Sequence, residues 1–423
     1  MRRPRLLLIA FHYPPIQGSS GVHRALAFSR YLPEFGWDVS VLTVHPRAHE
    51  DVLAGNLRMI PDGIDVIRAP AWDAARHFAI GGRYPSVLAL PDRWSSWVPF
   101  GTMAGARALR RGQFDAILST FPIASAHLIG RNLQRRFALP WVADFRDPMA
   151  TATYPHQRRL RELWTRIQDS ALREASRITV TTPGAAGFYR RMYPAVSPER
   201  IVVVENGFDA EIFGPAGPGL QSPIAATDPV LLLHSGVLYP RERDPEPFFR
   251  ALRRLLERRA LGTRPIRVRL RASGYEDRYR EMLARLGLQE VVTLAPSLPY
   301  AEALREMQAA SALLLFQAAV CNEQIPAKAY EYLYAGRPIL GLTDPTGDTG
   351  QLLGRFGVPG IAPLEHEDAI VEMLASALPR ILDGRYPVPS RDAVMAVSRR
   401  AGAEGLAGLL DQVVTERPGP AAG

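Results

Sequence analysis

The chain has 423 residues, 47% of them hydrophobic and 22% charged, which is the composition of a globular protein and not of a disordered or fibrous one. Its length suggests two or three domains, and its formal net charge of +9 favours anionic partners. A single cysteine excludes an intramolecular disulfide, no apolar run reaches the length of a membrane span, and no block interleaves basic and aromatic residues as in nucleic-acid binding.

In the first half of the chain, short apolar runs alternate with helical patterns. We expect strands at 5–11, 38–44, 64–68, 115–119, 140–145, 177–181 and 201–204. We expect helices at 21–33, 98–111, 123–136, 157–175 and 184–192. Strands that are apolar throughout and are joined by helices indicate a parallel sheet covered on both faces.

The second half repeats this alternation after a Pro-, Gly- and Ser-rich segment, 216–228, which we interpret as a linker. Further strands are expected at 229–235, 266–271, 290–294, 311–317, 338–343 and 358–362. Further helices are expected at 245–259, 276–286, 300–310, 326–335 and 366–382. The sequence thus predicts an α/β protein with two Rossmann-like, doubly wound domains, 1–215 and 229–388. Helices within 389–415 should pack back toward the first domain, and 416–423 should be a disordered tail. Because ligands bind at the carboxyl ends of such strands, we expect the domains to face a central cleft.

The segment 322–340 (NEQIPAKAYEYLYAGRPIL) carries the strongest local signal. Of the 51 basic residues only Lys328 is a lysine, and it falls in the first turn of a helix that Pro326 can begin and Gly336 can end. A helix start after a strand favours an anion such as a phosphate. Glu331, on the same helix face, could accept hydrogen bonds from a ribose, and Glu323 in the preceding loop from a second polyol. The alternative is an exposed Lys328–Glu331 pair beside a solvated loop.

A second candidate lies in the first domain, where the loop 17–21 (QGSSG) follows a strand and opens a helix. Gly18 and Gly21 would allow the backbone to approach a phosphate closely, and Arg24 one turn later could reach the same anion. Taken alone, this is a weak glycine-rich turn.

With these residues in place, the sequence resembles the family 4 glycosyltransferases of bacterial polysaccharide and cell-surface type. The two glutamates with seven residues between them, followed by YLYAGRPIL, are similar to the donor-site motif of that family. Further similar segments are 13–24, 122–130, 140–148, 205–209 and 298–300. The resemblance implies the GT-B fold, retention of anomeric configuration and independence from metal. It also implies that the first domain binds the acceptor and the second binds a UDP- or GDP-linked sugar, with no other cofactor.

The resemblance assigns roles on the donor side. It implies that Glu331 binds the ribose, Glu323 the donor sugar and Lys328 the diphosphate. Gly236 and Leu298 match positions near the donor, where the family presents backbone. Arg241 and Arg243 are the candidates for further diphosphate contacts, although their spacing is irregular and the usual lysine is missing; a solvated Arg/Glu cluster is the alternative.

On the acceptor side, 141–148 (WVADFRDP) ends a strand and brings acidic and basic residues together. Many relatives carry a histidine there, and in this chain Asp144 or Arg146 takes its place. A carboxylate could orient or deprotonate the acceptor, and Arg146 could steady the leaving phosphate. Asp147 and His127 are further acceptor-side candidates. The alternative for the three charged residues is a salt network that anchors the loop.

The expected partners are therefore a nucleotide sugar and a hydroxyl acceptor, either a glycan or a lipid-linked molecule. The basic helix 157–175 with Trp164, together with Trp94 and Trp97, could also attach the protein to an anionic membrane, the alternative being a helix that covers the sheet. We expect a cytoplasmic protein, peripheral on the inner face of the membrane if this attachment exists. Two other functions remain open: a nucleotide-sugar epimerase of the same fold, and an inactive sugar-nucleotide-binding or scaffold protein.

Overall fold

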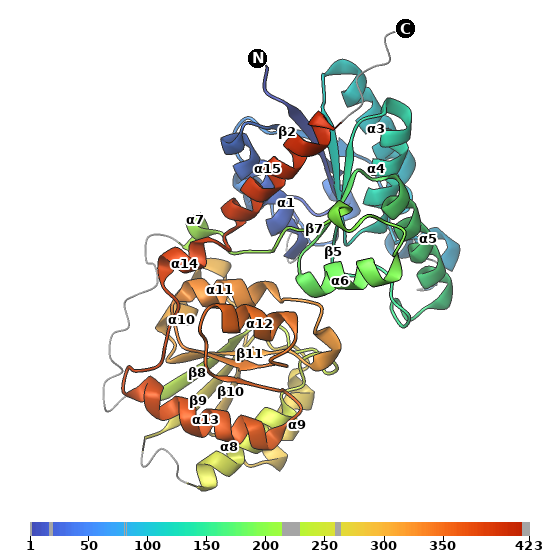
Figure 1. Cartoon of the computed structure of the whole chain (residues 1–423). Helices are drawn as coiled ribbons and strands as arrows, with labels where there is room; N and C mark the ends of the chain where they lie inside the picture. The colour runs from blue at the N-terminus through green and yellow to red at the C-terminus, as the bar shows by residue number, and fades with distance from the viewer. Residues whose placement is uncertain are drawn as a thin grey trace. The chain divides into compact units, whose positions relative to one another are not determined.

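The computed structural model describes residues 2–16, 20–79, 81, 83–213, 229–258 and 264–416. The chain forms two compact units, one of Met1–Glu205 with Arg399–Gly423 and the other of Asn206–Ser398 (Figure 1). The linker expected at 216–228 and most of the tail expected at 416–423 lie outside the described residues. The closing segment 389–415 divides between the units, since its first helix belongs to the second unit and its last helix to the first.

The first unit contains a parallel sheet of seven strands in the order β3-β2-β1-β4-β5-β6-β7. The strands are β1 (Arg5–Ala10), β2 (Asp38–Val44), β3 (Asp65–Ala69), β4 (Ala116–Thr120), β5 (Trp141–Arg146), β6 (Arg177–Val180) and β7 (Ile201–Val203). Its helices are α1 (Ser20–Tyr31), α2 (Ala74–His77), α3 (Trp97–Arg111), α4 (Ala124–Phe137), α5 (Arg158–Glu174), α6 (Pro183–Met192) and α15 (Arg399–Thr415).

Both faces of this sheet are buried, which is why its strands are apolar at most positions. Leu7 and Ile9 of β1 belong to the hydrophobic cluster that includes α3, α4, α5 and α6. Leu6 and Leu8 belong to the opposite cluster, which includes α1 and α15. The indole of Trp37 in this second cluster donates to Asp411 of α15 over 3.0 Å, so the end of the chain is an integral part of the first unit.

The second unit contains a parallel sheet of six strands in the order β10-β9-β8-β11-β12-β13. The strands are β8 (Val230–Ser235), β9 (Ile266–Arg271), β10 (Val292–Ala295), β11 (Ala312–Phe316), β12 (Ile339–Leu342) and β13 (Ile361–Ala362). Its helices are α7 (Ala210–Phe213), α8 (Glu246–Glu257), α9 (Glu276–Arg285), α10 (Tyr300–Ala309), α11 (Ala327–Ala335), α12 (Asp348–Arg355), α13 (Glu367–Leu382) and α14 (Arg391–Met395). The helices α8, α9 and α13 cover one face, and α10, α11, α12 and α14 cover the other.

The observed sheets confirm the predicted fold class of two Rossmann-like parallel α/β domains, and most strand ends fall within two residues of the predicted positions. The sequence analysis named no helix at α12, which contains Gly350 and Gly354 and so has a weak helical pattern. Gly350 is needed there because a Cβ would lie 2.3 Å from the carbonyl oxygen of Asp344. Packing against the preceding loop therefore determines this helix.

Candidate functional site

Several of the predicted donor residues gather at the point in the second sheet where the order of the strands reverses. β8 and β11 are neighbours in the sheet, and the helices that follow them, α8 and α11, lie on opposite faces. The two connections therefore diverge and leave room at the carboxyl ends of the strands, where open α/β sheets bind their ligands. Gly236 directly follows β8, and Lys328 lies in the first turn of α11.

The amine of Lys328 lies against the backbone at Gly236. A Cβ at this glycine would be 2.7 Å from the Lys328 Nζ, and the glycine φ of +116° is unfavourable for other residues. The Lys328 Nζ is also 3.1 Å from the Nε2 of His234, the penultimate residue of β8. The predicted pair of Gly236 and Lys328 is thus brought together, with His234 as a third member that the sequence analysis did not identify.

Burial and the nearby charge of Arg243 lower the pKa of Lys328 to about 7, and Glu331 acts in the opposite direction. An anion bound beside the amine would favour its charged form. Arg243 itself donates to the carbonyl of Val237 over 3.2 Å, whereas Arg241 is exposed. Of the two predicted arginines, Arg243 is therefore the one with an electrostatic effect on Lys328.

Glu331 is one turn after Lys328 on α11 and accepts a hydrogen bond of 2.6 Å from the hydroxyl of Tyr300. Tyr300 begins α10, two residues after the half-buried Leu298. The next residue on α11, Tyr332, is buried, and its hydroxyl accepts from the backbone N–H of Ser235 over 2.9 Å. This bond attaches α11 to the end of β8 and so helps to hold Lys328 beside Gly236.

Glu323 lies, partly exposed, in the connection between β11 and α11. The amide of Gln317 donates to the carbonyls of Cys321 (2.6 Å) and Gln324 (2.9 Å). Thr349 of α12 donates to the Gln324 carbonyl as well, over 3.0 Å. These bonds hold the loop that carries Glu323 in one conformation. The sequence signals for Gln317 and Thr349 are too ordinary to have identified them.

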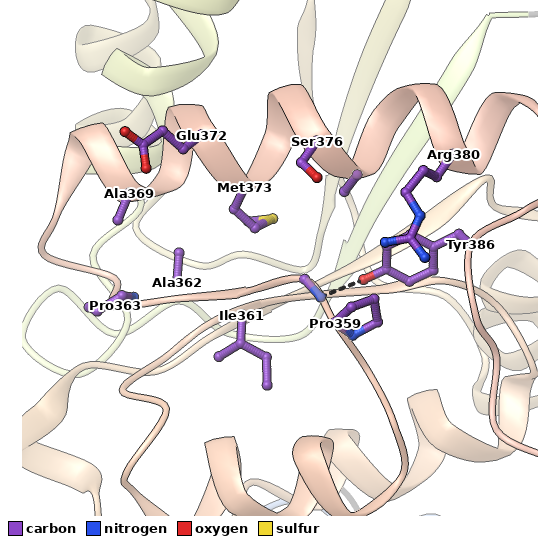
Figure 2. Close-up of a pocket in the computed structure, with 12 residues that line it drawn as sticks. Pro359, Ile361, Ala362, Pro363, Ala369, Glu372, Met373, Ser376, Arg380 and Tyr386 are labelled. Carbon is purple, nitrogen blue, oxygen red and sulfur yellow. Dashed lines mark hydrogen bonds between the residues drawn. The ribbon is translucent and has the colours of Figure 1, made fainter.

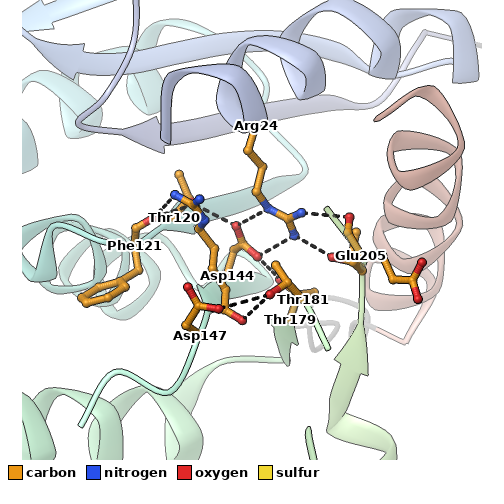
Figure 3. Close-up of polar contacts among 10 residues, drawn as sticks. Arg24, Thr120, Phe121, Asp144, Asp147, Thr179, Thr181 and Glu205 are labelled. Atoms are coloured by element: carbon orange, nitrogen blue, oxygen red, sulfur yellow. Dashed lines mark hydrogen bonds and ion pairs between the residues drawn. The ribbon is translucent and has the colours of Figure 1, made fainter. Parts of the chain in front are cut away.

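In the first unit, Arg24 and Asp144 form a buried, bidentate ion pair (Figure 3). The guanidinium donates to both carboxylate oxygens, over 3.0 Å from Nε and 2.9 Å from Nη2. The hydroxyls of Thr120 and Thr179 donate to the same carboxylate, each over 2.8 Å. Arg24 also donates to the carbonyls of Val204 and Glu205, so it connects α1, β5 and the end of β7.

Burial alone would raise the pKa of Asp144, but the charge of Arg24 and the bonds from Arg24, Thr120 and Thr179 hold that pKa below its usual range. The carboxylate is 0% exposed and Arg24 is 3% exposed. Neither group has the access to a substrate that the sequence analysis expected, and the arrangement suits a role in positioning the surrounding segments. Gly21 is buried at the start of α1, and Gly18 lies outside the described residues.

Arg146 and Asp147 follow at an irregular end of β5. The register with β6 shifts between Asp144 and Arg146, and Arg146 has a φ of +65°, a conformation that costs free energy in a residue other than glycine. The Arg146 guanidinium donates to the carbonyl of Phe121 over 3.4 Å. Burial raises the pKa of Asp147, against the effect of Arg146. Asp147, which is partly exposed, is thus better suited than Asp144 to accept a proton.

His127 is part of the core. Its ring is 1% exposed, its Nδ1 lies 2.8 Å from the hydroxyl of Ser119, and burial lowers its pKa to about 4. The expected role of His127 on the acceptor side does not fit this position, because the surrounding aromatic side chains of Phe121, Trp141 and Phe145 cover it.

Of the expected membrane contacts, Trp97 and Trp164 are covered, whereas Trp94 is partly exposed. Trp97 is 0% exposed, and Trp164 and Ile167 of α5 are buried in the first unit's core. The apolar side of α5 therefore packs on the sheet, as the alternative interpretation proposed, and cannot insert into lipid. In the described part of the chain, none of the helices combines the length and the apolarity that crossing a bilayer needs.

Two cavities are lined by residues other than Lys328. One of about 270 Å³ separates α13 from the edge strand β13, with Arg380 and Tyr386 at one end (Figure 2), and includes none of the predicted site residues. The other, of about 180 Å³, lies in the first unit near the carboxyl ends of β1 and β2 and is lined by His12, His49, Asp73, Arg93 and Trp94 among others. Within the described ranges, no group of three or more His, Cys, Asp or Glu residues could hold a metal ion.

Comparisons with known proteins agree with this description. Residues 20–207 match the family described as Glycosyl transferase 4-like domain. A search of curated proteins finds no match. Similar solved structures include a sucrose-phosphate synthase from Thermosynechococcus elongatus, with a TM-score of 0.68 and 16% identity over 98% of this chain and 100% of that one. A glycosyltransferase from Rickettsia africae ESF-5 has a TM-score of 0.65 and 12% identity, with 98% and 100% of the two chains covered. The lipopolysaccharide outer core galactosyltransferase WaaB has a TM-score of 0.60 and 12% identity, with 96% and 99% covered.

The two parallel-sheet units and these neighbours define the class: the chain has the two-domain GT-B fold. More narrowly, residues 20–207 match a glycosyl transferase 4-like domain, and this match agrees with the resemblance to family 4 glycosyltransferases. The family match supports glycosyltransferase activity, and with it a sugar donor and an acceptor.

Proposed function

We propose that the protein transfers a sugar from a UDP- or GDP-linked donor to a hydroxyl acceptor, with retention of configuration and without a metal ion. The observation that carries this proposal is the cluster of Gly236, Lys328 and Glu331 at the carboxyl ends of β8 and β11. It combines a close backbone approach, a cation and a carboxylate, which suit a phosphate and a ribose.

In the proposed reaction, the bond between the sugar's anomeric carbon and the diphosphate oxygen breaks, and its electron pair leaves with the diphosphate. The acceptor hydroxyl forms the new bond on the same face of the sugar and gives its proton to the leaving diphosphate. Lys328, Arg243 and the start of α11 would stabilise the charge that develops on this leaving group. Glu331 would hold the ribose, Glu323 the sugar hydroxyls, and the backbone near Leu298 the base.

The first unit is proposed to bind the acceptor. Arg146 and Asp147 are its candidates for contact with the reacting groups, whereas Arg24 and Asp144 would hold the segment that carries them. By analogy with the galactosyltransferase named above, we propose an acceptor in cell-surface polysaccharide or glycolipid synthesis, and a cytoplasmic location where nucleotide sugars are available.

The test is a screen of UDP- and GDP-sugars in two steps. Thermal shifts identify the donors that bind the folded protein, since a ligand of the native state raises the melting temperature. Incubation with those donors should then release free UDP or GDP slowly, by hydrolysis in the absence of acceptor. A 2-epimer of the sugar among the products would indicate the epimerase instead, and binding without any turnover would indicate an inactive binder.

A further inference from the structure

His234 is the unexpected member of the donor cluster. It interrupts the apolar strand β8 (VLLLHS), and its side chain is 0% exposed. A buried imidazole needs partners for both of its nitrogens. Here the Nδ1 lies 2.8 Å from the carbonyl oxygen of Leu314 on the neighbouring strand β11, and the Nε2 lies 3.1 Å from the Lys328 Nζ.

These two contacts fix the tautomer. A carbonyl oxygen can only accept, so the proton of the neutral ring must be on Nδ1, and Nε2 is left as an acceptor. Burial and the charge of Lys328 lower the pKa of His234 well below its usual value, which keeps the ring neutral. The edge of Phe316, with its ring centroid 5.1 Å away, limits rotation of the imidazole. Nε2 is therefore an acceptor held 3.1 Å from the Lys328 amine, and the backbone of Gly236 also interacts with the ring.

We propose that His234 is a positioning residue, whose Nε2 accepts a hydrogen bond from the Lys328 ammonium and holds it beside Gly236, where the donor diphosphate would bind. The use of this contact in catalysis rests on the function proposed above, but the contact itself does not. The charged groups around the Lys328 amine are Arg243, from the segment after β8, and Glu331, on α11 itself. Neither group replaces His234 as the hydrogen-bond acceptor of the amine, because Arg243 repels the ammonium and Glu331 is bonded to Tyr300.

The chain allows a direct test, because Lys328 is its only lysine. In full-length protein labelled with ¹³C at lysine Cε, NMR shows one lysine signal, whose position as a function of pH gives the protonation midpoint of Lys328. The wild-type midpoint should be near pH 7. His234→Leu removes the acceptor of a charged hydrogen bond and should lower this midpoint by about one pH unit. His234→Gln, whose amide oxygen can accept a hydrogen bond, should keep the midpoint close to the wild-type value.

Tyr386→Phe is the matched control. Its hydroxyl is buried in the same unit, where it donates to the carbonyl of Ile339 and accepts from the backbone N–H of Gly360. The dashed line at the Tyr386 hydroxyl in Figure 2 marks the second of these bonds. This variant should lower the stability of the second unit without moving the Lys328 midpoint. An unchanged midpoint in His234→Leu, or an equal change in Tyr386→Phe, would overturn the proposed contact.

The catalytic consequence is measured separately, with a donor found in the screen. His234→Leu should lower kcat about tenfold with a smaller change in KM, because the misplaced ammonium is needed most when the diphosphate leaves. His234→Gln should recover most of this loss. If His234→Leu shifts the NMR midpoint but retains wild-type kcat, the positioning role in catalysis is wrong although the contact exists. If no donor is turned over, the proposed function fails, and the NMR result still decides the contact.

Discussion

Replacing Asp144 by Asn tests the assignment of the Arg24–Asp144 pair to a structural role. The change leaves the Arg24 guanidinium, which is 3% exposed, without its counter-charge. Removal of one partner from a buried ion pair costs about 3–5 kcal/mol, because it leaves a charge that is buried and uncompensated. With a urea dependence near 3 kcal/mol per M for a unit of this size, the unfolding midpoint should fall by about 1 M or more.

Tryptophan fluorescence is a selective assay for this unit. The six tryptophans all precede residue 205: Trp37, Trp72, Trp94, Trp97, Trp141 and Trp164. Their emission therefore reports the unfolding of the first unit alone, even if the second unfolds in a separate transition. The matched control is Glu34→Gln, which breaks an ion pair with Arg400 whose side chains are 41% and 53% exposed. An exposed pair of this kind should cost less than about 1 kcal/mol.

The pH dependence provides a second measure of the same pair. Because the folded pKa of Asp144 is lowered, its contribution to stability is complete above the unfolded value of about 4 and is lost as the pH falls through the folded value. The difference between wild type and Asp144→Asn should be constant near pH 7 and decrease below about pH 4. In addition, Arg24→Met combined with Asp144→Asn should cost less than the sum of the two changes. A cost for Asp144→Asn no larger than that of Glu34→Gln would refute the reasoning.

Three further predictions concern the donor cluster. Lys328→Ala should lower donor turnover more than tenfold through the loss of one charge contact in the transition state. Nucleotide release is the assay, and Arg250→Ala on the exposed side of α8 is the control. A near wild-type rate would show that Lys328 does not stabilise the leaving diphosphate. Glu331→Ala should weaken donor binding about tenfold or more, since a hydrogen bond to a charged group contributes about 1.5–3 kcal/mol. Calorimetry measures this affinity, and full affinity would contradict the ribose assignment. Gly236→Ala should destabilise the second unit by about 1–3 kcal/mol, because the glycine has a positive φ and because the new Cβ would displace the Lys328 amine. Circular dichroism during urea unfolding measures the loss of stability. An unchanged transition would show that the loop adapts to the new side chain.

The sequence was informative where local pattern determines structure. Continuous apolar runs such as LLLIA and ALLLF predicted the buried strands, because a parallel sheet covered on both faces requires them. The start and end of α11 were predictable from Pro326 and Gly336, although Pro326 caps the helix and Ala327 begins it. Gly236 and Lys328 lie side by side in the structure. This is expected of two residues that both match the donor-site pattern of one family.

The sequence was less informative where partners come from distant segments. Arg24 and Asp144 are 120 residues apart, and the glycine-rich turn next to Arg24 suggested a phosphate instead of a carboxylate as its partner. His127 has the same residue type as a catalytic histidine, and only its tertiary surroundings place it in the core. The one available signal for His234 was a lone polar residue within an apolar strand, and its partners, Leu314 and Lys328, lie 80 and 94 residues later.

The return of α15 to the first unit makes the second unit an insertion within the first. The chain leaves the first unit after Glu205 and re-enters it at Arg399, and a Cβ on Gly402 would lie 3.4 Å from the Glu205 carbonyl oxygen, so the exit and the re-entry are neighbours. During synthesis, the first unit cannot complete its hydrophobic cluster around Leu6 and Trp37 until the last helix has been made. The inserted second unit can therefore finish folding before the first. A stop codon shortly before residue 399 would remove α15 and so damage the first unit, although most of that unit is translated first.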